Sequence, residues 1–251
     1  MIKKELFLEK ISPLICNGIA HRGLHNEEFT ENGLKAFENA VNNNFAFELD
    51  IHLARDNKLI VCHDRNLKRT TGKEGIIEQL TSDQIRQEYR LHDGGVVPTF
   101  EEVLDLVQER VPIVTELKPE FKNHKALAKY TEETLRRIKD PKSIMLISFD
   151  PRALMPFRHS RFATSILVSD GDKKSAKVFY LKKLFDSGDF DKNMTMEDRV
   201  RKYQKDNFLN IWTVNSKEDV DAYLDFVDTF TFEKVDPEYV REKLKTKYNK
   251  E

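Results

Sequence analysis

Residues 45–53, FAFELDIHL, alternate large apolar side chains with smaller or polar ones. Side chains two residues apart share one face of a β-strand, so Glu48 and Asp50 lie on the same face, about 6.6 Å apart at Cα. The opposite face is entirely apolar. In a barrel, one strand face points inward and the other packs against helices. We therefore expect Glu48 and Asp50 to point into a barrel.

A second apolar run, residues 59–62, follows after the polar turn 55–58. Such a short connection predicts an antiparallel hairpin, because parallel strands need a crossover of a dozen or more residues. A turn centred between residues 56 and 57 would place His63 opposite Asp50. The hairpin is therefore expected to bring an imidazole to the carboxylates.

Strand and helix patterns alternate along the rest of the chain. Further strands are expected at residues 15–20, 113–118, 144–149, 162–168, 208–214 and 230–232. Over 251 residues this alternation predicts an α/β fold, a TIM (β/α)8 barrel, with a small hairpin and helical insertion after strand 2, at about 54–98. Between 169 and 207 only residues 176–181 resemble a strand, so the barrel is expected to be irregular there. No linker divides the chain, which predicts a single domain over residues 1–251.

Composition excludes several classes of protein. Lys and Arg total 42 and Asp and Glu total 43, so a formal net charge of -1 offers no bulk field for nucleic acid. No stretch is apolar enough to span a bilayer, and the N-terminal residues lack the apolar core of a signal peptide. Cys16 and Cys62 are too few for a disulfide framework. We predict a cytoplasmic protein with a small-molecule partner, and its oligomeric state stays open.

The expected strand 113–118, IVTELK, puts Glu116 and Lys118 on one face. With Glu48 and Asp50, two strands then offer three inward carboxylates. Oxygen ligands of this kind suit a hard divalent cation, Mg²⁺ or Ca²⁺, rather than Zn²⁺. The alternative is that the Glu48 and Asp50 carboxylates are solvated on an exposed half-sheet.

His21 and Arg22 follow directly after the first strand, at the rim where barrel active sites form. With His63 and Lys118 they supply two acid–base groups and two anion contacts, a set that fits cleavage of a phosphate ester. The alternative is a Schiff-base lysine, as in barrel aldolases. A carboxylate at Glu116 opposes that role for Lys118, because it stabilises the ammonium form.

Several motifs occur in a recognisable order. They are IAHRGLHNEEFTENGLKAFENAV from residue 19, FELDIHLARDNKLIVCHDRNLKRTTG from residue 47, PTFEEVLDLV from residue 98, TELKP from residue 115, and the shorter SF at 148–149 and WTVN at 212–215. In order and spacing these motifs resemble the glycerophosphodiester phosphodiesterase family. The resemblance is close over residues 19–119.

The resemblance implies a TIM barrel that hydrolyses glycerophosphodiesters to glycerol 3-phosphate and an alcohol with the help of a divalent cation. By position, the family's functional residues match the metal ligands Glu48, Asp50 and Glu116, the catalytic histidines His21 and His63, and the substrate-binding residues Arg22, Lys118 and Trp212. For Trp212 the alternative is core packing.

The chain departs from the family pattern at two places. Residues 30–33 read TENG where PENT or PENS is usual, and Phe232 and Glu233 replace a TD-type signature. Two alternative functions stay open: a lysophospholipase D-like enzyme, which would differ only at the rim, and a non-catalytic barrel that binds phosphodiesters or sugar phosphates.

Overall fold

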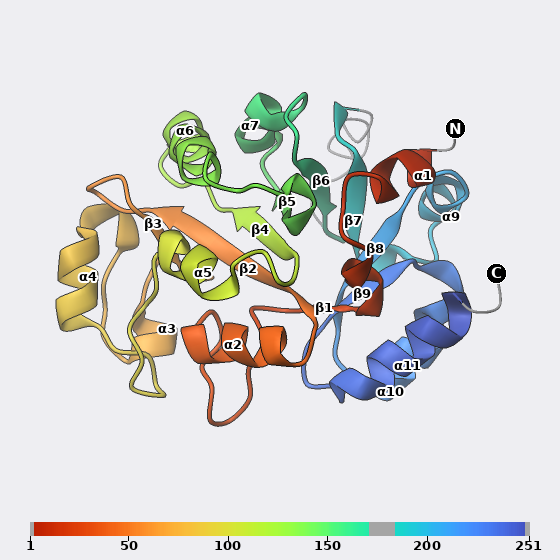
Figure 1. Ribbon diagram of the computed structural model, residues 1–251, viewed down its shortest axis with the longest axis horizontal. Helices are drawn as coiled ribbons and strands as arrows, with labels where there is room; N and C mark the ends of the chain where they lie inside the picture. The colour runs from red at the N-terminus through yellow and green to blue at the C-terminus, as the bar shows by residue number, and fades with distance from the viewer. Residues whose placement is uncertain (1–2, 171–183, 249–251) are drawn as a thin grey trace.

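The computed structural model describes residues 3–170 and 184–248 (Figure 1). Within these residues, eight parallel strands pair in the order β1-β9-β8-β7-β6-β5-β4-β2, and β1 also pairs with β2, which closes the barrel. The strands are β1 (Ile19–Ala20), β2 (Ala46–Leu53), β4 (Ile113–Leu117), β5 (Ile144–Ser148), β6 (Ala163–Val168), β7 (Ser187–Asp191), β8 (Leu209–Val214) and β9 (Thr229–Phe232). The predicted TIM barrel is confirmed.

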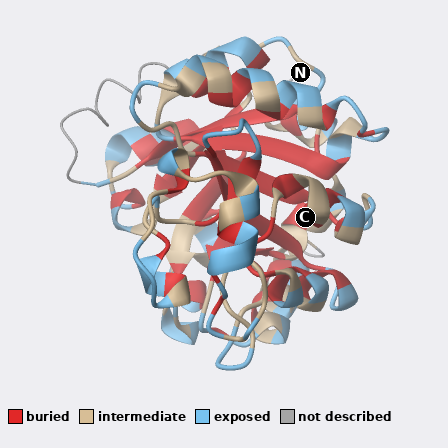
Figure 2. Cartoon of the chain, turned by 90° about the vertical axis from the view of Figure 1, so that its left-hand side faces the viewer, coloured by how far each residue is buried: buried red, intermediate tan, exposed pale blue. Residues whose placement is uncertain are grey.

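Helices surround the barrel, and Figure 2 shows buried strands enclosed by helices with exposed outer faces. The α-helices are α1 (Lys3–Leu8), α2 (Leu34–Asn42), α3 (Lys68–Thr71), α4 (Ser82–Glu88), α5 (Phe100–Val107), α6 (His124–Leu135), α7 (Pro151–Leu154), α9 (Asp198–Gln204), α10 (Lys217–Tyr223) and α11 (Pro237–Tyr248). The 3₁₀ helices are η1 (Pro13–Asn17), η2 (Ile77–Gln79), η3 (Pro141–Ser143), η4 (Met155–Phe157), η6 (Lys192–Met194) and η7 (Leu224–Phe226). Of the helices in the described part of the chain, none combines the length and the apolar character needed to cross a membrane.

The two faces of β2 pack as the alternation predicts. Phe47 and its apolar neighbours on the outer face join a core shared with the helices, where the rings of Phe47 and Phe37 of α2 stack with centroids 4.6 Å apart. The inner face carries Ala46, Glu48 and Asp50, all buried. Apolar burial on the outer face therefore fixes which side chains of β2 enter the barrel.

The interior of the barrel changes character along its axis. At the N-terminal end of the strands, Phe7, Ile11 and Ile15 pack against inward residues such as Ile19 and Met145. Nearer the C-terminal end, beside the apolar Ile147 and Leu167, the interior contains several buried polar residues: Glu48, Asp50, Glu116, Ser165, Asp189, Asn210 and Thr231. Among the described residues, this apolar cluster fills the N-terminal end of the barrel, and the cavity beside the polar groups lies toward the C-terminal ends of the strands.

Residues 54–98 lie beside the barrel between β2 and α5, and they contain β3 (Leu59–Val61), α3, η2 and α4 (Figure 1). β3 pairs antiparallel with β2, which confirms the hairpin. The segment has a small core of its own, built from residues such as Leu67, Ile85 and Tyr89. Capping boxes begin α4 at Thr81 and α5 at Thr99.

One strand prediction needs correction, and one barrel strand was not predicted. Residues 15–20 are mostly not a strand: η1 occupies Pro13–Asn17, Gly18 has a φ of 104°, and β1 contains only Ile19–Ala20. Proline at the start of the 3₁₀ helix and glycine at its end explain this. The sixth barrel strand is β7, SGDFD, whose glycine and two aspartates have low strand propensity. The expected strand at 176–181 lies outside the described residues.

Candidate active site

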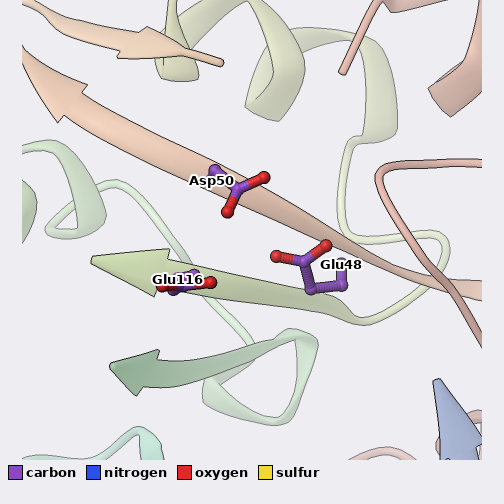
Figure 3. Close-up of side chains that lie close together, drawn as sticks. All are labelled: Glu48, Asp50 and Glu116. Atoms are coloured by element: carbon purple, nitrogen blue, oxygen red, sulfur yellow. The ribbon is translucent and has the colours of Figure 1, made fainter. Parts of the chain in front are cut away.

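Three carboxylates from two neighbouring strands meet inside the barrel. β2 and β4 run parallel with Asp50 opposite Glu116. Glu48 lies two residues before Asp50 on the same face of β2. One oxygen from each of the three side chains lies within 4.8 Å of the others (Figure 3). The structure thus brings together the three acidic residues that strand parity predicts.

The three negative charges in this cluster repel one another. Burial raises the pKa of Glu48 well above its usual range, and the nearby carboxylates of Asp50 and Glu116 raise it further. Burial also raises the pKa of Glu116, to about 7. For Asp50 the cost of burial is outweighed by Lys118, His63 and Arg22, and its pKa is lowered. A buried set of oxygen donors with this mutual repulsion fits a hard divalent cation.

Lys118 lies directly after β4 and neutralises part of the cluster. Its Nζ is 3.2 Å from Asp50 Oδ1 and 3.2 Å from Glu116 Oε1. Burial lowers its pKa, but Glu116 and Asp50 outweigh that effect, so the pKa of Lys118 is raised. The side chain is held as an ammonium, which opposes the Schiff-base alternative.

Arg22 and Asn32 line the cluster from the loop between β1 and α2. The Arg22 backbone N–H donates to Glu48 Oε2 at 3.1 Å, and its guanidinium donates to Glu31 Oε1 at 2.8 Å. Asn32 Nδ2 donates to Asp50 Oδ2 at 2.9 Å. Asn32 was not among the predicted site residues, although it belongs to the TENG stretch that keeps two residues of the family pattern.

His21 directly follows β1, and its side chain contacts Glu233, the residue that follows the last barrel strand, β9. Its Nδ1 donates to Glu233 Oε2 at 2.9 Å, and its Nε2 is 3.9 Å from Glu48 Oε2. The bond from His21 is the main reason why the pKa of Glu233 is lowered. Sequence reasoning missed Glu233 as a site residue, although it noted the unusual residue after β9.

His63 reaches the site, but not through the predicted pairing. Ile51 pairs with Val61, and the Cys62 N–H donates to the Asp50 carbonyl at 3.0 Å, so Cys62 and not His63 lies opposite Asp50. The turn is centred on residue 56 and not between residues 56 and 57, which moves the pairing by one residue. His63 Nδ1 donates to Asp64 Oδ1 at 2.6 Å.

Neighbouring residues position the backbone of His63 and change the pKa of its ring. His52 Nε2 donates to the His63 carbonyl at 3.2 Å. Burial lowers the pKa of the His63 ring below its usual value, and Asp50 and Asp64 offset part of that effect. His63 is therefore neutral over more of the pH range near 7 than an exposed histidine.

A cavity of about 180 Å³ opens between the two histidines, and both His21 and His63 line it together with Trp212. The Trp212 ring meets Phe149 edge-on, with centroids 5.4 Å apart. Among the described residues, Trp212 Nε1 is buried without a hydrogen-bond partner. Trp212 therefore lines the cavity and has an N–H donor available to a ligand, so its position is not explained by core packing alone.

The wall of the same cavity includes a polar group that sequence reasoning missed. Asp189 of β7 is fully buried, and it accepts hydrogen bonds from Ser165 Oγ at 2.9 Å and Asn210 Nδ2 at 3.2 Å. Burial raises its pKa to about 6, and the two hydrogen bonds offset part of that effect. A strand as poor in apolar residues as β7 gave no periodic signal that would have identified it.

Comparison with known proteins identifies similar chains. The model of the glycerophosphoryl diester phosphodiesterase family matches residues 21–232. A glycerophosphodiester phosphodiesterase from Bacillus altitudinis is 30% identical over 147 residues, a match that covers 55% of this chain and 60% of that protein. The match therefore spans less than two thirds of that relative.

Solved structures share the fold over nearly the whole chain. The crystal structure of a glycerophosphodiester phosphodiesterase from Parabacteroides distasonis superposes with a TM-score of 0.76 at 26% identity, covering 92% of this chain and 97% of that one. An Oleispira antarctica phosphodiesterase, solved in complex with the product sn-glycerol-3-phosphate, has a TM-score of 0.75 at 20% identity and covers 92% and 96% of the two chains.

Proposed function

Because this chain belongs to the glycerophosphoryl diester phosphodiesterase family, we propose that it hydrolyses glycerophosphodiesters to glycerol 3-phosphate and an alcohol, with the help of a divalent cation. The observation that carries the proposal is one cavity lined by His21, His63, Glu48 and Glu116. Acid–base groups and a cation site at one position are what cleavage of a phosphodiester requires.

Glu48, Asp50 and Glu116 are the residues that would hold the cation, and the choice between Mg²⁺ and Ca²⁺ stays open. When bound, the ion supplies positive charge to the phosphate oxygens. Asn32 orients the Asp50 carboxylate through its hydrogen bond of 2.9 Å. Lys118 limits the repulsion between Asp50 and Glu116.

The phosphate is expected to bind between Arg22 and Lys118. Among the described residues, Arg22 Nε is a buried donor without a hydrogen-bond partner, although it lies 3.7 Å from Asp50 Oδ2. A phosphate oxygen would satisfy that donor, and guanidinium groups suit phosphate geometry. Lys118 adds a second positive charge at the same end of the barrel.

The two histidines are held in the same way. The Nδ1–H of each ring donates to a carboxylate, that of His21 to Glu233 and that of His63 to Asp64. Nε2 is then the ring nitrogen that can take up or release a proton. One Nε2 takes the proton of the substrate's glycerol hydroxyl as it attacks phosphorus, and the other gives a proton to the oxygen of the leaving alcohol. Water then opens the cyclic phosphate to give glycerol 3-phosphate.

Trp212 is proposed to contact the glycerol half of the substrate. The ring lines the cavity beside the histidines, and its Nε1 can donate to a glycerol hydroxyl. A non-catalytic binding barrel is disfavoured, because a pure binder has no use for two histidines that are each oriented by a carboxylate.

A lysophospholipase D-like activity is a second candidate. Phe149 lines the cavity and is 43% exposed, so it offers an apolar surface at the rim where an acyl chain could lie. Turnover of lysophosphatidylcholine that exceeds turnover of glycerophosphocholine, and that is sensitive to detergent, would favour this candidate.

Release of glycerol 3-phosphate from a panel of glycerophosphodiesters, assayed with Mg²⁺, with Ca²⁺ and with EDTA, tests the proposal. We expect turnover with one or both ions and loss of turnover with EDTA. H21A and H63A should each lower turnover by about two decades or more. H159A is the control, because His159 is exposed outside the cavity. Near-normal turnover in both H21A and H63A would contradict the proposed roles.

We also propose that residues 1–251 form one barrel domain with an insertion at about 54–98. The cytoplasmic location and the exclusion of nucleic acid stay predictions from the sequence.

A further inference from the structure

A second opening adjoins the catalytic cavity on the side of residues 54–98. It has a volume of about 700 Å³, against about 180 Å³ for the catalytic cavity, and His63 lines both. Its basic side chains are Arg65, Lys68, Arg69 and Lys118. We call this opening, defined by His63 and those four residues, the basic groove.

The charges that face the basic groove are mainly positive. Its four Lys and Arg side chains are accompanied by two acidic ones, Asp64 and Glu120. Arg69 and Lys118 are already bound by carboxylates of the site. Arg65 and Lys68 are therefore the cations most available to a ligand.

The ion pairs of these two cations are weakly held. Arg65 lies 3.5 Å from Glu120, and Lys68 pairs with Glu74 at 2.7 Å with the two side chains 64% and 61% exposed. Exposed pairs of this kind contribute about 0–1 kcal/mol. An anionic group of a ligand can therefore replace Glu120 or Glu74 at little cost.

The position of the groove indicates which part of a substrate it would bind, an argument that rests on the proposed function. A phosphodiester has two arms, and in-line displacement places the attacking glycerol hydroxyl and the leaving alcohol oxygen on opposite sides of phosphorus. The small cavity beside Trp212 suits the glycerol arm, which all substrates share. The larger groove, which begins at His63 and Lys118, suits the arm that varies, the alcohol.

We propose that the basic groove binds the alcohol half of the substrate and selects alcohols that carry a further anionic group, such as a second phosphate, over alcohols that carry a quaternary ammonium. A quaternary ammonium binds best against aromatic faces. The Phe121 ring, in the loop after β4, already carries the Arg65 guanidinium 5.0 Å from its centroid. Arg65 would repel a second cation there.

Two substrates that differ only in one phosphate test this selection: glycerophosphoinositol and glycerophosphoinositol 4-phosphate, with glycerophosphocholine as the cationic comparison. We expect kcat/KM to be about tenfold or more higher for the phosphorylated substrate, the effect of one charge-assisted contact. Raising the salt concentration should reduce this preference, because exposed charges are screened.

Variants locate the effect in the groove. R65Q and K68Q should each lower the ratio of the two kcat/KM values by about threefold or more. K58Q is the matched control, because Lys58 is also an exposed lysine in the 54–98 segment, paired with Glu101 at 3.3 Å, but lies outside the groove. The ratio should be unchanged in K58Q.

Equal kcat/KM values for the two inositol substrates, or a preference for glycerophosphocholine, would overturn the inference and leave the proposed function intact, because glycerol 3-phosphate would still be released. A ratio that K58Q lowers as much as R65Q does would also overturn it. Failure to release glycerol 3-phosphate from any of the three diesters would remove the proposed function and this inference together.

Discussion

The guanidinium of Arg69 donates two hydrogen bonds to the carboxylate of Glu31, at 2.7 and 2.8 Å. Arg69 belongs to α3, and Glu31 belongs to the loop after β1. Arg69 also donates to Asp64, the partner of His63, and Glu31 accepts from Arg22. A continuous series of bonds therefore connects a proposed catalytic histidine with the proposed phosphate-binding arginine.

Removal of the link at Arg69 should impair catalysis. We expect R69Q to lower kcat/KM by about tenfold, because the three charge-assisted bonds that position Asp64 and Glu31 are lost. The double variant E31Q/R69Q should fall no further than the lower of the two single variants, since both remove the same link. R152Q, which removes an exposed arginine paired with Asp150, is the control. Wild-type kcat/KM in R69Q would refute the positioning role.

The pH profile should report the partner of His63. Burial lowers the pKa of His63, and the bond to Asp64 partly restores it by stabilising the imidazolium. In D64N that support is lost, so the imidazolium releases its proton at a lower pH. We expect the limb of the kcat/KM profile that belongs to His63 to move to lower pH. D83N, at an exposed aspartate, should leave the limb in place, and an upward shift in D64N would contradict the assignment.

Binding of a divalent cation should stabilise the protein in a pH-dependent way. The pKa of Glu116 is raised to about 7 and that of Glu48 is also raised, so protons compete with the ion below neutral pH. At about 100 times the Kd the ion should add about 2.7 kcal/mol, a rise in Tm of about 5–10 °C.

Thermal melts with Mg²⁺ or Ca²⁺ against EDTA, at pH 8 and at pH 5.5, measure this effect. The rise in Tm should be larger at pH 8. E116Q should lose most of the rise, because one of the three carboxylates is gone. An equal rise at both pH values, or an unchanged rise in E116Q, would speak against this site.

Asp189 should make stability fall as pH increases. Its folded pKa is about 6 and its ordinary value 3.8, so its contribution is fully present below about 3.8 and is lost as the pH passes about 6. The loss amounts to about 3 kcal/mol. Urea unfolding between pH 4 and 7 should show D189N gaining stability relative to the wild type as pH rises. D225N, at an exposed aspartate, should show no such trend.

Local patterns were sufficient for part of this site. Alternation over residues 45–53 and 113–118 predicted the inward faces of β2 and β4. Because the apolar face of each strand packs against the helices, the polar face has to point into the barrel. The position of the catalytic rim followed from the end of β1.

The missed features depend on contacts that no local pattern contains. Glu233 meets His21 across 212 residues of sequence, so spacing cannot indicate the pair. The register of the hairpin depends on one position of its turn, which shifted His63 by one residue from the place opposite Asp50. β7 was missed because Asp189 and Gly188 break the apolar pattern. The buried Asp189 carboxyl is tolerated there because it accepts hydrogen bonds from Ser165 and Asn210.

The backbone N–H of His21 donates to the carbonyl of Phe232, and its side chain donates to Glu233. His21 thus lies where the first and last barrel strands, β1 and β9, pair and close the barrel, and β1 contributes only two residues to that pairing. During translation, a growing polypeptide carries His21 and all three carboxylates long before Glu233 emerges. We expect ribosome-bound chains to stay inactive until Glu233 has left the exit tunnel, so that the enzyme becomes active only when its barrel is complete.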